Sequence, residues 1–125
     1  MTPEVAAAVD EIKAAFPNAT VEVKEEGDAV VVLLDPIDPG QPYMQRESWI
    51  GFRITFQYPY ADVYPHFVRG DLSRVDGAKL GEGMSVATFE DRSAVQISRR
   101  SNQLNPSTDT ALIKLHKVLA WLRAR

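Results

Sequence analysis

The sequence contains no cysteine. Disulfide bonds, thiolate metal sites and nucleophilic catalysis by a thiol are therefore excluded for the chain as written. Histidine is scarce as well, since only His66 and His116 are present, and two imidazoles are too few for a convincing metal cluster. The composition thus predicts neither a metal site nor a cofactor.

Long hydrophobic runs and a targeting signal are also missing. No apolar run approaches the ~20 residues that a membrane-spanning helix requires. The segment from Met1 to Phe16 places acidic residues in an alanine-rich helical pattern, whereas a secretory signal begins with basic residues and an apolar core. We expect a cytoplasmic protein without a membrane partner.

The charge is unevenly distributed along the chain. Residues 1–91 contain 7 Lys or Arg against 16 Asp or Glu, whereas residues 92–125 contain 7 against 1. The two segments either complement each other across the fold or leave a basic surface that attracts an acidic partner. Nucleic acid is not expected, because the net charge is −3 and the basic residues are not interleaved with exposed-looking aromatic residues.

The 125 residues predict a single α+β domain, residues 1–125. Thr2-Pro3 has the character of a helix start and precedes apolar residues at helical spacing up to Phe16. A second amphipathic helix, whose apolar stripe runs from Leu112 to Leu122, is expected to begin within 105–109. Both should pack on an antiparallel sheet of about four strands. The expected extended segments are 20–24, 29–34, 50–56, 85–89 and 93–98.

The segment from Trp49 to Val68 combines a strand with two Tyr-Pro pairs. Its side chains alternate between apolar and polar up to Phe56, as in a half-buried strand. Proline then forces an ordered, stiff connection. Exposed aromatic and proline-rich turns suit protein interfaces, so this connection is a candidate partner-binding surface, although one or two of its rings should pack in the core. The candidate residues are Tyr58, Pro59, Tyr60, Tyr64 and Pro65.

Together, these features resemble the core of ubiquitin-conjugating enzymes (the UBC-like fold). The strand Phe52–Phe56 leads into Tyr58-Pro59 and Tyr64-Pro65, much as the strand of that family leads into its F-P-x-x-Y-P turn. Ala94–Ser98 is similar to the family's catalytic C-L-x-I-L segment, and Asn105-Pro106 to the W-S-P that follows it. The spacing between the Tyr-Pro pairs is longer, and the His-Pro-Asn triplet is replaced by Met84-Ser85-Val86.

The resemblance places Ala94 in the slot of the catalytic cysteine. A thiolate there would carry a ubiquitin-like C-terminus as a thioester, which a methyl group cannot do. Arg99 and Asn102 are candidate auxiliary residues for an acidic tail or an oxyanion. The alternatives are a solvated arginine and a turn-forming asparagine. His66 is expected to pack beside the Tyr-Pro turn rather than act as a general base.

The resemblance implies a divergent bacterial carrier of a ubiquitin-like modifier, inactive as written because position 94 is alanine. Whether this alanine is natural or replaces a cysteine is open. The implied partners are a ubiquitin-like protein, its activating enzyme and a deconjugating metalloprotease. A second hypothesis is a cysteine-less UBC-like module that binds a ubiquitin-like protein or an assembly. A third is a small α+β protein similar to secretion chaperones that dimerises through its sheet.

Overall fold

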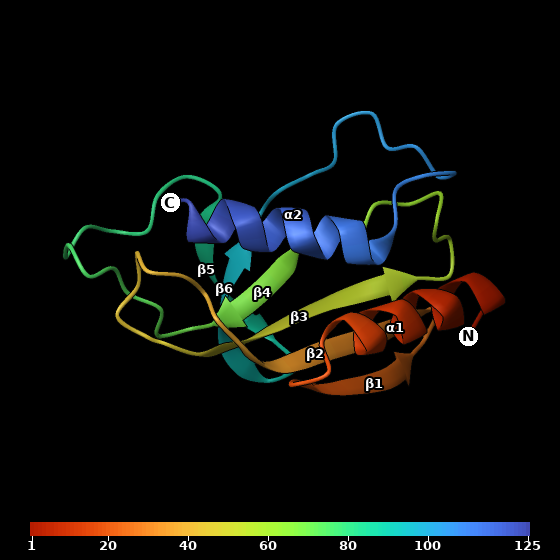
Figure 1. Ribbon diagram of the computed structural model, residues 1–125, viewed down its shortest axis with the longest axis horizontal. Helices are drawn as coiled ribbons and strands as arrows, with labels where there is room; N and C mark the ends of the chain where they lie inside the picture. Colours follow the sequence, from red (N-terminus) through yellow and green to blue (C-terminus); the bar gives the residue numbers. More distant parts are fainter.

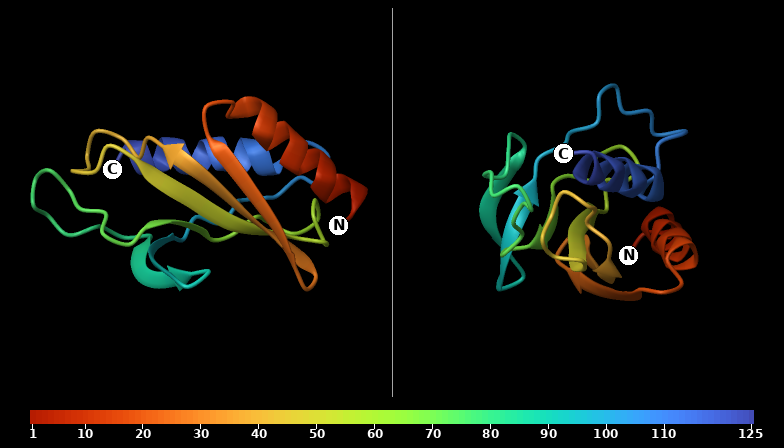
Figure 2. Two further views of the ribbon diagram at one scale, coloured as in Figure 1. Left: turned by 90° about the horizontal axis from the view of Figure 1, so that it is seen from below. Right: turned by 60° about the vertical axis from the view of Figure 1, so that its left-hand side comes forward.

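The computed structural model describes residues 1–125 as two helices and one six-stranded antiparallel sheet. The expected α+β class and both terminal helices are confirmed. The helices lie side by side on the same face of the sheet (Figures 1 and 2), joined in part by Phe16 and His116, whose rings stack with centroids 5.5 Å apart. None of the helices is long and apolar enough to cross a bilayer. The elements in chain order are α1 (Pro3–Ala15), β1 (Thr20–Glu26), β2 (Ala29–Ile37), β3 (Ser48–Thr55), β4 (His66–Arg69), β5 (Met84–Phe89), β6 (Arg92–Ile97) and α2 (Ala111–Arg123).

The sheet has six strands in the order β1-β2-β3-β4-β6-β5 instead of the four that we expected. The short strand β4 pairs with β3 on one side and with β6 on the other. It therefore joins the β5–β6 hairpin to the same sheet. This hairpin turns through Glu90 and Asp91, both at positive φ. Strand β4 has only four residues and directly follows a proline. Its sequence shows no alternation of apolar and polar residues from which a strand could be predicted.

The start of α1 is confirmed, and that of α2 is corrected. The hydroxyl of Thr2 accepts a hydrogen bond from the amide of Val5 at 3.1 Å, as expected for an N-cap. Helix α2 begins at Ala111, with Thr110 as its cap, so residues 105–109 belong to the preceding connection. In that connection the Asp109 carboxylate accepts a hydrogen bond from the amide of Asn105, which closes a separate turn.

Two hydrophobic clusters occupy the two faces of the sheet. The main core joins α1 and α2 to alternate residues of the strands, among them Val30, Val32 and Leu34. The intervening residues Val31 and Leu33 belong to a smaller cluster on the opposite face, together with Phe67, Phe89 and Ala94. The uninterrupted apolar run of β2 is therefore covered on both sides, by the helices on one face and by the β5–β6 hairpin on the other.

Glycine at position 51 allows this hairpin to fold over the sheet. A Cβ atom there would lie 2.4 Å from Cε2 of Phe89, so no side chain fits between the ring and the backbone of β3. Phe89 in turn stacks on Phe67 and Trp49, with centroid distances of 4.7 and 6.0 Å. The smaller cluster is thus a mixed aliphatic and aromatic core built around these stacked rings.

Candidate functional site

The Tyr-Pro connection, residues 57–65, lies against the start of α2. The hydroxyl of Tyr58 accepts a hydrogen bond from the amide of Ala111 at 3.0 Å and so satisfies a free donor of the first helical turn. The Tyr64 ring lies beneath the Arg100 guanidinium, 4.1 Å from its centroid. The peptide bonds before Pro59 and Pro65 are cis. Only the Tyr60 ring, 78% exposed, is largely free for a partner.

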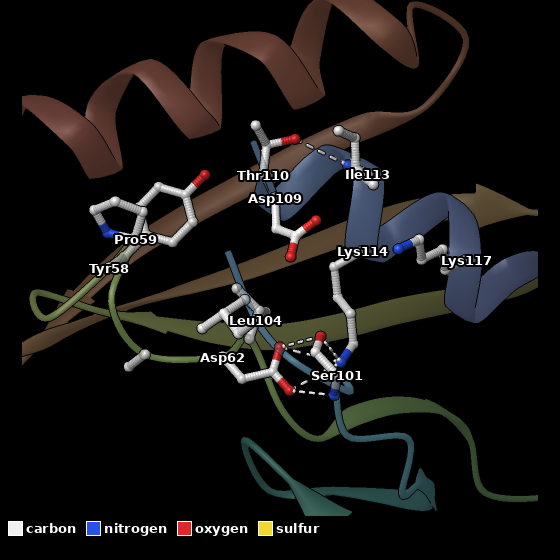
Figure 3. A pocket seen from close by; sticks show the side chains of 12 residues that line it. Tyr58, Pro59, Asp62, Ser101, Leu104, Asp109, Thr110, Ile113, Lys114 and Lys117 are labelled. Atoms are coloured by element: carbon white, nitrogen blue, oxygen red, sulfur yellow. Dashed lines mark hydrogen bonds and ion pairs between the residues drawn. The ribbon is translucent and has the colours of Figure 1, made fainter. Parts of the chain in front are cut away.

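Three side chains lock this connection to α2 and to the β6–α2 connection, residues 98–110. The Lys114 ammonium donates to both carboxylate oxygens of Asp62, at 3.1 and 3.0 Å, and to the hydroxyl of Ser101 at 2.9 Å. Asp62 also accepts from the amide and the hydroxyl of Ser101 at 2.7 and 2.8 Å. Each of the three residues comes from a different segment, so the network ties the three segments together (Figure 3).

This network is a structural lock and not a Ser–Lys nucleophile. Partial burial would raise the pKa of Asp62, but the hydrogen bonds from Ser101 and the Lys114 ammonium outweigh it and lower that pKa below its ordinary value. The Lys114 side chain already donates hydrogen bonds to both oxygens of Asp62 and to the hydroxyl of Ser101, so it presents no lone pair that could accept the Ser101 proton.

His66 lies in the main core below this network. Its ring packs on Phe52 with centroids 5.0 Å apart, and neither ring nitrogen has a hydrogen-bond partner. Burial, reinforced by the Lys114 charge, lowers the pKa of His66 to about 3. The imidazole is therefore neutral at physiological pH and has no route to solvent as a general base. No group of three or more His, Asp or Glu side chains is placed to hold a metal ion.

A cleft rich in positive charge runs along α2 beside the β6–α2 connection, and we call it the cationic groove. Arg99, Arg100, Asn102 and Lys117 are exposed along it, and its floor includes the half-buried Trp121. The Arg99 guanidinium lies 5.1 Å from the centroid of the Trp121 ring. Arg125 covers the same ring at 4.4 Å.

The cations of this groove are not neutralised within the chain. Arg99, Arg100 and Lys117 form no ion pair with a carboxylate. Asp109 is the one acid that lines the groove, and it is hydrogen-bonded to its own connection. The basic C-terminal segment therefore does not pair with the acidic part of the fold here; it leaves a positive surface.

The structure separates the residues that the resemblance groups together. Ala94 lies in β6, is 1% exposed and belongs to the smaller cluster on the face away from the helices. Arg99 and Asn102 line the cationic groove beside α2. The nearest residue to Ala94 on the next strand, Arg69, is paired with Asp71. A thiol at position 94 would thus be buried in the smaller cluster and would not line the groove that contains Arg99 and Asn102.

Sequence reasoning missed the network of Asp62, Ser101 and Lys114, as well as the role of Lys117. One signal was present: Lys114 interrupts the apolar stripe of α2 and is only 7% exposed. A lysine on the buried face of a helix requires an acidic partner. Nothing in the sequence indicated that this partner is Asp62, 52 residues earlier.

No protein-family model, no curated protein and no solved structure matches this chain. The fold and the site define the chain as a small α+β protein with a cationic groove beside its second helix. Its likeness to ubiquitin-conjugating enzymes depends on the sequence motifs alone.

Proposed function

We propose that this chain is a UBC-like binding module whose cationic groove holds an extended acidic segment of a partner protein. A ubiquitin-like protein is the partner that the sequence motifs favour. The observation that carries the proposal is the set of unpaired cations at Arg99, Arg100 and Lys117 beside the Trp121 ring. The segment would pair its carboxylates with the two guanidiniums, which bind carboxylates in a bidentate manner.

The burial of Ala94 supports binding over catalysis as the present function. A catalytic thiol must be accessible to a partner's C-terminus, whereas this position is enclosed by two aromatic rings and two aliphatic side chains. The groove, by contrast, is open to solvent and needs no rearrangement to accept a chain. Binding driven by exposed cations is fast and sensitive to salt.

The test is fluorescence anisotropy with a labelled hexaglutamate peptide at low salt. The double variant Arg99→Glu/Arg100→Glu should weaken binding at least about 10-fold, because it removes two charge-assisted contacts and adds repulsion. The control Arg46→Glu/Lys79→Glu has the same net charge but alters exposed loop residues outside the groove. It should change the affinity less than about twofold. Equal losses in the two variants would show attraction by overall charge without a site.

Identity of the partner needs a second titration. A ubiquitin-like domain with an acidic C-terminal tail should bind, and the same domain without its tail should not. Binding that survives removal of the tail would place recognition on the globular surface of the partner.

A thioester carrier is the second proposal, and its support is the order of the sequence motifs around Ala94. It predicts that Ala94→Cys forms an adduct sensitive to reducing agents when the cognate activating enzyme and modifier are supplied. Absence of the adduct with active partners removes this proposal and leaves the binding proposal intact.

A further inference from the structure

The cationic groove continues into a second, narrower pocket, which we call the anchor pocket. Ser101, Asp109, Lys114 and Lys117 line both. The anchor pocket extends from these shared residues towards the Tyr-Pro connection, between the β6–α2 connection and the first turn of α2 (Figure 3). A segment lying in the groove can therefore reach the anchor pocket without crossing another element.

Aliphatic and polar side chains share the walls of the anchor pocket. Pro59 and Ala61 contribute from the Tyr-Pro connection, Leu104 from the β6–α2 connection and Ile113 from α2. Ile113, a large aliphatic residue at the rim of the anchor pocket, is 40% exposed. An apolar group placed here would remove these walls from water, at about 25 cal/mol for each Å² buried.

The polar groups of the pocket are already satisfied. Asp62 and Lys114 neutralise each other, and the Thr110 hydroxyl accepts a hydrogen bond from the amide of Ile113. The carboxylate of Asp109 accepts one from the amide of Asn105. An apolar occupant therefore leaves no buried polar group without a partner, which is the usual cost of such binding. Lys117 and Asp109, which line both the pocket and the groove, are the charged residues of the pocket without an ion-pair partner.

The pocket is small. Its free volume is about 20 Å³, close to the space of one or two water-sized groups. A methyl group can enter the pocket as it stands, and an isopropyl group can place one methyl inside and keep the other at the open mouth beside Ile113, whereas an aromatic ring requires the walls to move apart.

Building on the proposed function, we propose that the bound segment carries a small aliphatic residue, alanine or valine, next to its acidic residues, and that this residue occupies the anchor pocket. The acids then lie along Arg99, Arg100 and Lys117. The lock formed by Asp62, Ser101 and Lys114 holds the two connections together at this pocket. Recognition thus depends on shape as well as on charge.

The test compares labelled peptides that share four glutamates and differ at one flanking position, occupied by glycine, valine or tryptophan. Each is made with this residue before and after the glutamates, since the direction of the segment is free. In one direction, valine should bind about 5-fold more tightly than glycine. In the same direction, the tryptophan peptide should gain less affinity over the glycine peptide than the valine peptide does.

Two variants of the protein alter the pocket alone. Ala61→Leu fills it and should abolish the preference for valine while the glycine peptide binds as before. Leu104→Ala enlarges it and should shift the preference from valine to leucine or tryptophan. Circular dichroism and the amide spectrum verify that both variants fold.

The outcomes separate this inference from the proposed function. If all glutamate peptides bind through Arg99 and Arg100 but valine gives no gain in either direction, the anchor is refuted and the groove stands. A preference for tryptophan over valine in the wild-type protein also refutes the anchor. If no glutamate peptide binds, both the groove and the anchor are refuted.

Discussion

At the scale of single residues, the buried imidazole of His66 stands out because its two nitrogens have no partner. Such unsatisfied groups cost about 1–3 kcal/mol each. The ring therefore lowers stability where it is, and its removal should be favourable. The sequence predicted that His66 packs beside the Tyr-Pro turn, but not that its two ring nitrogens lack partners.

We predict that His66→Leu raises the free energy of unfolding by about 1–3 kcal/mol at pH 7. The advantage should grow as the pH falls from 6.5 to 4.5. The pKa of His66 in the folded state, about 3, lies below its ordinary value of 6.5, so the unfolded state binds a proton first as the pH falls. The free energy of unfolding of the wild-type protein therefore decreases by up to ~1.4 kcal/mol per pH unit. Urea unfolding at several pH values measures this.

His116, exposed on α2, provides the control for that measurement. Urea unfolding of His116→Gln at the same pH values separates the effect of the buried position from the loss of a histidine as such. If His66→Leu shows the same slope as the wild-type protein, the imidazole is not buried in its neutral form.

A second prediction at this scale concerns the lock. Lys114→Met should lower the free energy of unfolding by about 3 kcal/mol, because it leaves the Asp62 carboxylate without its cation. Adding Asp62→Asn to this variant should restore part of the loss, which a double-mutant cycle by urea unfolding measures. Because the pKa of Asp62 is lowered in the folded state, its ionised carboxylate stabilises the protein at pH values above 3.8, its ordinary pKa. This contribution is lost as the pH falls below 3.8 and through the lowered pKa. Strictly additive losses would show that the two side chains are not coupled.

At the scale of elements, the β5–β6 hairpin covers the face of the sheet that the helices leave open. It was predicted as two short extended segments, but their burial could not be derived from local alternation. Phe89 reaches the cluster because Gly51, on β3, leaves room for its ring. This contact joins positions 38 residues apart, and no local pattern in the sequence encodes it.

We predict that Ala94→Cys yields a thiol protected by this hairpin. Alkylation in the native protein should be on the order of 100-fold slower than for Val86→Cys, since labelling requires local opening. Val86 lies on the same hairpin and is 94% exposed, which makes it the matched control. Mass spectrometry follows both reactions. Equal rates would mean that position 94 is accessible, and the carrier proposal would gain support.

At the scale of the whole molecule, the segregation of charge is the feature that the sequence revealed most directly. The excess of basic residues in 92–125 was open to two interpretations, internal pairing or a free surface. Only Lys114 of the groove residues pairs internally, through Asp62, and Arg99, Arg100 and Lys117 stay free. The helices and most strands followed from apolar periodicity, whereas the groove arises from loops whose path is set by long-range contacts.

The two tryptophans provide the most direct test of the central claim, because Trp121 lies in the cationic groove and Trp49 in the cluster on the opposite face. The measurement is a titration of the ¹⁵N-labelled protein with hexaglutamate peptide, followed by the two indole N–H resonances. Our account predicts that the Trp121 resonance shifts saturably and that of Trp49 stays in place. A shift of Trp49 alone, or of neither resonance at saturating peptide, would contradict it.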